Sequence, residues 1–177
     1  MTTYEVMSLI VTSVSAIFIG ISVIYLSRQL KLFIAAHADN HEWNRRIETL
    51  HALGNIRGIN TDDLNEKFGF TNRKDPIPLA EILDAISENH SIQLTLHKLL
   101  NFYEGLANGV FMGAYDEESI KAYRRGPMER EFVRCKKYIE YRRHQSSKTV
   151  WIAYERLIKK WDEELLTSAD RKQTGKI

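Results

Sequence analysis

The residues best suited to binding a ligand lie between Lys121 and Lys148, where ten basic side chains accompany only three acidic ones. When this segment is projected on a helix, Arg130, Arg134 and Lys137 share one face, with a tyrosine beside them. Guanidinium groups match phosphate geometry, and tyrosine rings can stack on bases. The pattern favours a solvated face or attraction to anionic lipid head groups, with an anionic ligand such as a nucleotide as the alternative. The candidate ligand-binding residues are Arg124, Arg125, Arg130, Arg134, Lys137, Tyr141, Arg142 and Arg143.

Other residues with reactive side chains are isolated. Glu104 lies beside an apolar helix face, where a carboxylate needs a cationic partner, and we expect Arg142 or Arg143 to supply it. His37 and His41 have the spacing of a metal pair on a helix, but further ligands have no evident source. Cys135 has the surroundings of a small buried hydrophobe, and a single cysteine forms no intrachain disulfide.

Sequence signatures of enzymes are also missing. The chain has no phosphate-cradling G-x-x-x-x-G-K-[ST], no G-x-G-x-x-G, no H-E-x-x-H and no nucleophile elbow. Its 25 basic and 23 acidic residues give a net charge of +2, too small to indicate long nucleic acid as a partner. We expect a protein that is not an enzyme and that holds neither a cofactor nor a metal.

A long apolar stretch from Val6 to Leu26 contains no charged residue. About 20 such residues suffice for a helix to cross a bilayer, so the sequence predicts one transmembrane helix. A cleaved signal sequence fits less well, because the five residues that precede the stretch hold no Lys or Arg. Arg28 and Lys31 follow it, which predicts that the C-terminal part lies in the cytoplasm and the N-terminus outside.

Small residues recur every four positions within this apolar stretch. Such stripes let transmembrane helices approach closely, which predicts homo-oligomers, although small residues are common in membrane helices in any case. The expected packing face consists of Ser8, Thr12, Ala16 and Gly20.

The rest of the chain shows helical periodicity and no strand pattern. We predict an all-α protein in which a transmembrane helix, 1–27, continues into a helical stalk, 28–41. A cytosolic helical bundle follows at 42–166, and its polar end, 167–177, is predicted to be a disordered tail. Within the bundle we expect Asp116 to cap a short helix that ends near Arg125, and Gly126 and Pro127 to separate it from the next.

Three glycines repeat at intervals of four on one predicted helix: Gly105, Gly109 and Gly113. Each interior glycine costs about 1 kcal/mol of helix propensity relative to alanine. This ridge is expected to allow close approach of another helix within the bundle, with a ligand groove or a hinge as the alternatives.

Several short motifs resemble those of a known family. They include WNRR at 43–46, LNFYEGLANG at 100–109, GAYDEE at 113–118 and YIEYRR at 138–143. The chain resembles a family of uncharacterised bacterial proteins that have one N-terminal membrane span and a helical cytosolic domain of unknown function. The resemblance implies a single-pass membrane protein and supplies no active-site residues.

These observations together predict a membrane-anchored helical interaction module that self-associates on the inner face of a bacterial membrane. Tethering would raise the effective concentration of neighbouring copies. The alternative is a membrane effector, for example in antiviral defence, whose basic surface senses an anionic ligand such as a cyclic oligonucleotide and which acts on the membrane through its span. The expected partners are the lipid bilayer, further copies of the chain and a nucleotide ligand.

Overall fold

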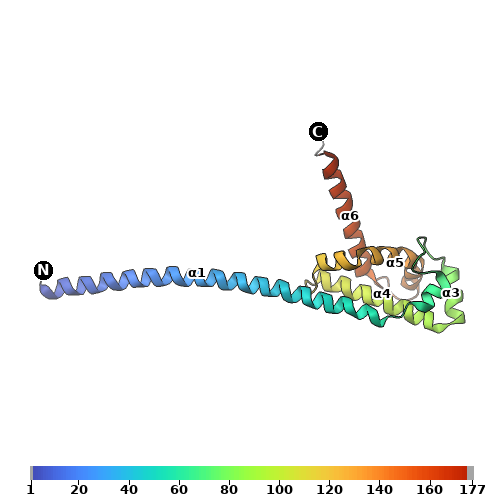
Figure 1. The fold of residues 1–177 in the computed structure, drawn as a ribbon, viewed down its shortest axis with the longest axis horizontal. Coiled ribbons are helices and arrows are strands. Elements are labelled where there is room, and N and C mark those ends of the chain that lie inside the picture. The colour runs from blue at the N-terminus through green and yellow to red at the C-terminus, as the bar shows by residue number, and fades with distance from the viewer. Residues whose placement is uncertain (1, 175–177) are drawn as a thin grey trace. The chain divides into compact units, whose positions relative to one another are not determined.

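In a computed structural model, residues 2–174 are described, apart from the side chains of 5, 6, 8–12, 16, 38 and 168–174. All regular structure in this range is helical, which confirms the predicted all-α class (Figure 1). The elements are α1 (Thr3–Gly54), the short 3-10 helix η1 (Asn55–Gly58), α2 (Asp62–Phe68), α3 (Leu79–Glu88), α4 (His90–Phe111), α5 (Glu117–Gln145) and α6 (Ile152–Thr174). The chain divides into two units, 1–44 and 45–177.

The first unit consists of most of α1. The helix runs without interruption because residues 3–54 contain no proline and only two glycines. It continues to Gly54, beyond the predicted stalk, 28–41, and into the predicted bundle. Its last ten residues belong to the second unit.

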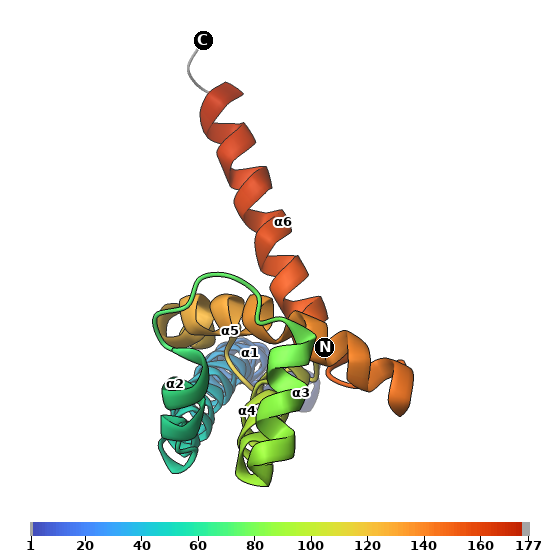
Figure 2. The ribbon, with the colours of Figure 1, turned by 90° about the vertical axis from the view of Figure 1, so that its right-hand side faces the viewer.

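Helix α4 is the centre of the second unit. It contacts α2, α3 and α6, and Figure 2 shows it between α2 and α3 with α5 crossing above them. Since neighbours surround it on several sides, its buried face is wider than the single apolar stripe of a helix that packs on one side only. The buried residues of α4 are Ile92, Leu96, Leu99, Leu100, Tyr103, Leu106, Ala107 and Gly109.

The end of α1 is joined to the start of α5 by hydrogen bonds. Thr49 is fully buried, and its hydroxyl accepts a hydrogen bond from the backbone N–H of Asp116 at 2.7 Å. Asp116 in turn caps α5, as predicted, because its carboxylate accepts the backbone N–H of Ser119 at 2.9 Å. The hydrogen bond from the Ser119 hydroxyl is the main cause that lowers the pKa of Asp116.

Helix α5 corrects the prediction of two helices separated at Gly126 and Pro127. It is a single helix with Pro127 in its interior. Proline removes one backbone hydrogen bond, but Ile120 before it and Met128 after it are both fully buried in the same core. Arg125 also pairs with Glu129 across the proline at 2.5 Å. Core packing on both sides therefore maintains the helix through a residue that usually ends one.

The chain end also differs from the predicted disordered tail, 167–177. The backbone of α6 is helical as far as Thr174, because residues 163–174 include good helix formers and neither glycine nor proline. After Trp161 the helix extends out of the bundle (Figures 1 and 2), and residues 162–167 are exposed.

The glycines of α4 do not form the helix-packing ridge that their spacing predicted. Gly105 is exposed, and a Cβ atom built there would meet nothing within 4 Å. At Gly109 a Cβ atom would overlap the ring of Tyr115, which lies in the loop after the helix. Gly113 has a φ of +71°, in the left-handed region, and it follows the C-terminal end of α4. The three glycines therefore have three different environments.

These environments predict opposite effects of alanine at two neighbouring glycines. Gly105→Ala should stabilise the bundle by about 1 kcal/mol, because it only removes the backbone entropy cost of glycine. Gly109→Ala should destabilise it, since the Tyr115 ring must move. Urea unfolding of the full chain in mild detergent, followed by tryptophan fluorescence, measures both changes. Stabilisation by Gly109→Ala would contradict the placement of Tyr115.

Candidate functional site

The basic residues predicted to share an outer face of α5 do not do so. Arg134 is only 3% exposed and lies against the loop between α2 and α3. Its guanidinium donates to the carbonyl oxygens of Arg73 at 2.5 Å and Thr71 at 3.1 Å, and it stacks over the Phe70 ring. Burial lowers the pKa of Arg134, and these acceptors satisfy its donors. Its role is to hold the loop.

Two more predicted ligand residues are committed to the C-terminal helix. Arg125 donates to the carbonyl oxygen of Trp161 at 2.9 Å and lies over the ring of the same residue. Arg143 pairs with Glu155 at 2.5 Å and donates to the carbonyl oxygen of Val150 at 2.8 Å. These guanidinium groups fasten α6 to α5, which leaves them little capacity for a ligand.

The remaining candidates are dispersed along α5. Lys137 pairs with Glu140 at 3.4 Å, and the Tyr141 ring packs against the core, 6.4 Å from the ring of Tyr138. Arg130 is exposed, and Arg142 is half-buried near His97, whose pKa is lowered by burial and by this charge. Arg124 lines a groove at the end of α1. The structure thus brings none of the eight together in a single phosphate site.

Glu104 has a different partner from the expected Arg142 or Arg143. Its carboxylate accepts the backbone N–H groups of Ala153 at 3.1 Å and Tyr154 at 2.8 Å, at the first turn of α6. The first N–H groups of a helix have no partner within it, and the helix dipole favours a negative charge there. Glu104 on α4 therefore caps α6 from another element, at a distance of about 50 residues in sequence.

This cap makes α6 sensitive to Glu104. Glu104→Ala should destabilise the bundle by about 1 kcal/mol, as the loss of a helix cap usually does. Glu104→Gln should cost less, since its amide oxygen can still accept one hydrogen bond. Glu118→Ala, on the exposed side of α5, is the control in the same urea unfolding experiment. Equal effects of Glu104→Ala and Glu118→Ala would contradict the cap.

Glu131 on α5 is a half-buried acid close to residues of α4 and α6. Glu131 has one carboxylate oxygen, Oε2, that is buried without a hydrogen-bond partner among the described residues. Burial raises its pKa, although Tyr103 and nearby arginines act in the opposite direction. Burial also raises the pKa of the adjacent Cys135 thiol to about 12, which makes this cysteine unreactive. The charged and titratable groups that act on Glu131 or on its neighbours are Tyr103, Arg124, Arg130, Arg134, Cys135 and Tyr154.

The raised pKa of Glu131 predicts a pH-dependent gain in stability from Glu131→Gln. The folded chain favours the protonated acid, and this contribution is complete below the unfolded pKa of about 4.5 and is lost as pH rises through the folded pKa. The variant should therefore match the native chain near pH 4 and exceed its stability at pH 7.5. Urea midpoints at several pH values measure the difference. A variant that is less stable at pH 7.5 would show that Glu131 contributes as a charged group.

Periodicity did not reveal an aromatic junction between α4, α5 and α6. The indole N–H of Trp151 donates to Asn101 at 2.7 Å, and its ring lies beside that of His97. His97 shares a 2.8 Å hydrogen bond with the Tyr138 hydroxyl. Trp151 has a φ of 52°, rare for a bulky residue, which these contacts hold in place. The pairing of His97 with distant residues gave no local signal in the sequence.

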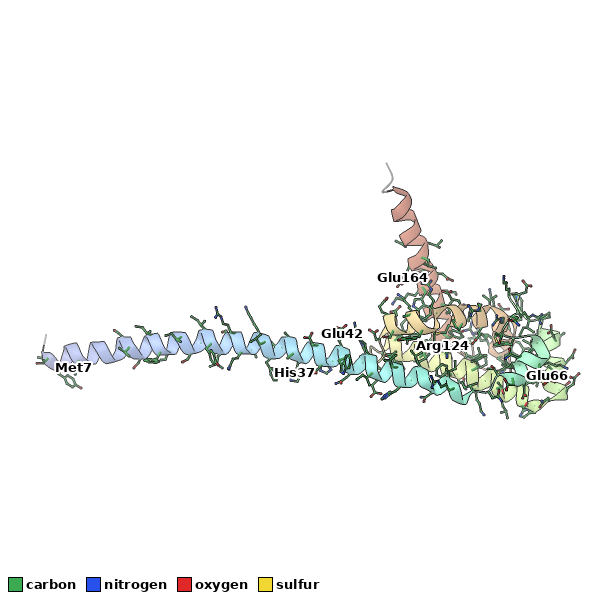
Figure 3. All side chains as sticks on the ribbon, viewed as in Figure 1. Met7, His37, Glu42, Glu66, Arg124 and Glu164 are labelled. Carbon is green, nitrogen blue, oxygen red and sulfur yellow. The ribbon has the colours of Figure 1, made fainter. Side chains whose placement is uncertain are left out.

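Metal-ligating side chains are not clustered. Among the residues that the structure describes, no group of three or more His, Cys, Asp and Glu side chains could hold a metal ion. The rings of His37 and His41 lie 6.5 Å apart, with Phe33 packed against His37 at 4.4 Å. Figure 3 labels His37 on α1. A cavity of about 410 Å³ lies between α2 and the α3–α4 junction, and its acids are Asp63, Glu66 and Glu88. Asp63 accepts a hydrogen bond from Ser91, and Glu88 pairs with Lys67.

The apolar residues of α1 form the largest exposed apolar segment. Of the helices within residues 2–174, α1 alone is long and apolar enough to cross a membrane, and none of its most apolar stretch is buried. Ile17, Phe18 and Ile21 are 62%, 67% and 59% exposed. In the predicted packing face, Gly20 has no atom near its Cβ position, and the side chains of Ser8, Thr12 and Ala16 lie outside the described residues. Self-association through this face stays a prediction.

Comparison with known proteins identifies a family and no closer relative. Residues 10–161 match the family described as a domain of unknown function, DUF4760. The match covers most of α1 and the bundle as far as Trp161. Comparison with curated proteins and with solved structures gives no match.

Proposed function

This chain belongs to the DUF4760 family, and we propose that it is a membrane-anchored helical module. In this proposal, α1 crosses the inner membrane of a bacterium once, and the bundle of residues 45–177 lies on the cytoplasmic side. The family has no known activity to transfer, so the proposal rests on the properties of the chain itself.

The observation that carries the proposal is the exposed apolar surface of α1. From residue 13 to residue 26, every described side chain is exposed, and the stretch contains no charge. A soluble protein rarely leaves such a continuous apolar surface in water, whereas hydrocarbon would cover it without cost. A helix also satisfies all its internal backbone hydrogen bonds, as a membrane span must.

The arrangement of charge supports the cytoplasmic location of the bundle. Arg28 and Lys31 follow the apolar stretch directly, and no Lys or Arg precedes it in the given sequence. Positive residues near the end of a span are retained on the cytoplasmic side. The bundle would then present the projecting end of α6, including Leu165 and Leu166, to partners in the cytoplasm.

Membrane fractionation of the full chain tests the anchor. We expect the native chain to stay in the membrane pellet after alkaline carbonate, and Ile17→Lys with Ile21→Lys to release it, because each charge costs about 3 kcal/mol at the bilayer centre. Leu94→Lys with Met112→Lys removes apolar surface of similar exposure from the bundle and should change nothing. Mass spectrometry of the recovered chain separates an anchor from a cleaved signal sequence.

Topology is measured in the same membranes. Cysteine introduced at exposed Tyr4 should react with an impermeant maleimide in intact spheroplasts, and cysteine at exposed Lys136 should react only after lysis. The native Cys135 is buried and provides the blank. Extraction of the native chain by carbonate, loss of the first 26 residues, or labelling at Lys136 in intact cells would each contradict the proposal.

A further inference from the structure

We propose that a groove where the end of α1 meets η1 and α5 binds a mononucleotide-sized anion. The groove has a volume of about 250 Å³ and lies entirely within residues 45–177. Its walls include Leu50, Leu53, Ile56, Arg57, Tyr123 and Arg124. The lining contains two arginines and no aspartate or glutamate, so its charge complements an anion.

The two arginines are available to a ligand, in contrast with those elsewhere on α5. Neither Arg57 nor Arg124 makes a hydrogen bond or a salt bridge with any residue that the structure describes. The charge of Arg124 acts to lower the pKa of Glu131, but the two side chains form no ion pair. Arg125, Arg134 and Arg143, by comparison, each bond to backbone carbonyl oxygens. Two guanidinium groups on one groove can bind phosphate oxygens through paired N–H donors.

An aromatic ring lies beside these charges. Tyr123 is 66% exposed, although it belongs to a helix of the bundle. Leu50, which also lines the groove, is 47% exposed. Leu53 and Ile56 form a buried and half-buried apolar floor. An exposed ring offers a stacking surface to a base, and stacking tolerates any base identity. Figure 3 labels Arg124 among the side chains of the bundle.

The combination defines the ligand class. Inorganic phosphate would use the arginines and leave the apolar wall and the ring in water, while an apolar peptide would leave the guanidinium groups without acceptors. A nucleoside phosphate uses both. The volume is below the usual range of ligand pockets, roughly 300–1,000 Å³, so the groove takes at most one nucleotide unit, and part of that unit stays in solvent.

This site differs from the basic surface that the sequence predicted on α5. Only Arg124 belongs to both, and Arg57 contributes from η1, outside the basic segment. The inference does not depend on the membrane anchor, because all the lining residues belong to the second unit.

Calorimetric titration of the full chain in mild detergent tests the site. The probes are AMP, GMP, CMP and UMP, with adenosine and inorganic phosphate as the two half-ligands. We expect saturable binding of at least one nucleotide at one site per chain, at least tenfold tighter than adenosine or phosphate. Arg57→Gln and Arg124→Gln should each weaken binding about tenfold, and Tyr123→Ala should weaken it while Tyr123→Phe retains it.

A charge-matched control separates the groove from general attraction. Lys98→Gln with Lys136→Gln removes two exposed positive charges outside the groove, and binding should stay within twofold of the native value. The proposal is overturned if none of the four nucleotides binds below millimolar concentration, if phosphate alone binds as tightly, or if the control weakens binding as much as the groove variants. Unfolding midpoints of all variants confirm that the bundle is intact.

Discussion

The bundle depends on the burial of α4 on several sides at once. Its residues from Ile92 to Gly109 meet α2, α3 and α6, so the positions of these three helices are fixed by one apolar surface. Burial of a large side chain contributes about 1.5–3 kcal/mol, and α4 supplies more fully buried large residues than any other helix that the structure describes. The same helix supplies Glu104, which caps α6, and Gly109, which admits the Tyr115 ring. Packing and polar contacts therefore converge on this element.

Several charged side chains inside the bundle form hydrogen bonds with backbone groups. Arg134 bonds to carbonyl oxygens of a loop, Arg143 bonds to carbonyl oxygens before α6, and Glu104 bonds to N–H groups at its start. Loops and helix ends carry polar groups without partners of their own, and leaving such groups buried would be costly. Much of the basic cluster on α5 is thus engaged in contacts within the bundle and is not available to a ligand. The groove at Arg57 and Arg124 is notable because its guanidinium groups have no such role.

Helix α1 meets two different requirements along its length. Its described side chains from residue 13 to residue 26 are exposed and uncharged, which suits hydrocarbon, while Thr49 and Leu53 near its end are buried in the bundle. A single helix can satisfy both because its backbone hydrogen bonds are internal and only its side chains determine the surroundings. On the bundle, the leucines at the end of α6 and the groove lined by Arg57 and Arg124 are exposed to solvent.

The sequence by itself determined the all-α class, the candidate membrane helix and the cap at Asp116, because each depends on local periodicity or on a residue and its near neighbours. Only the tertiary structure decided the course of α5 through Pro127, the burial of Arg134 and the partner of Glu104. Helical projection places residues relative to their own helix axis, and it holds no information about a loop that packs over α5 or a helix end 50 residues away. For the same reason, Arg57 could not be joined to Arg124 before the fold was known.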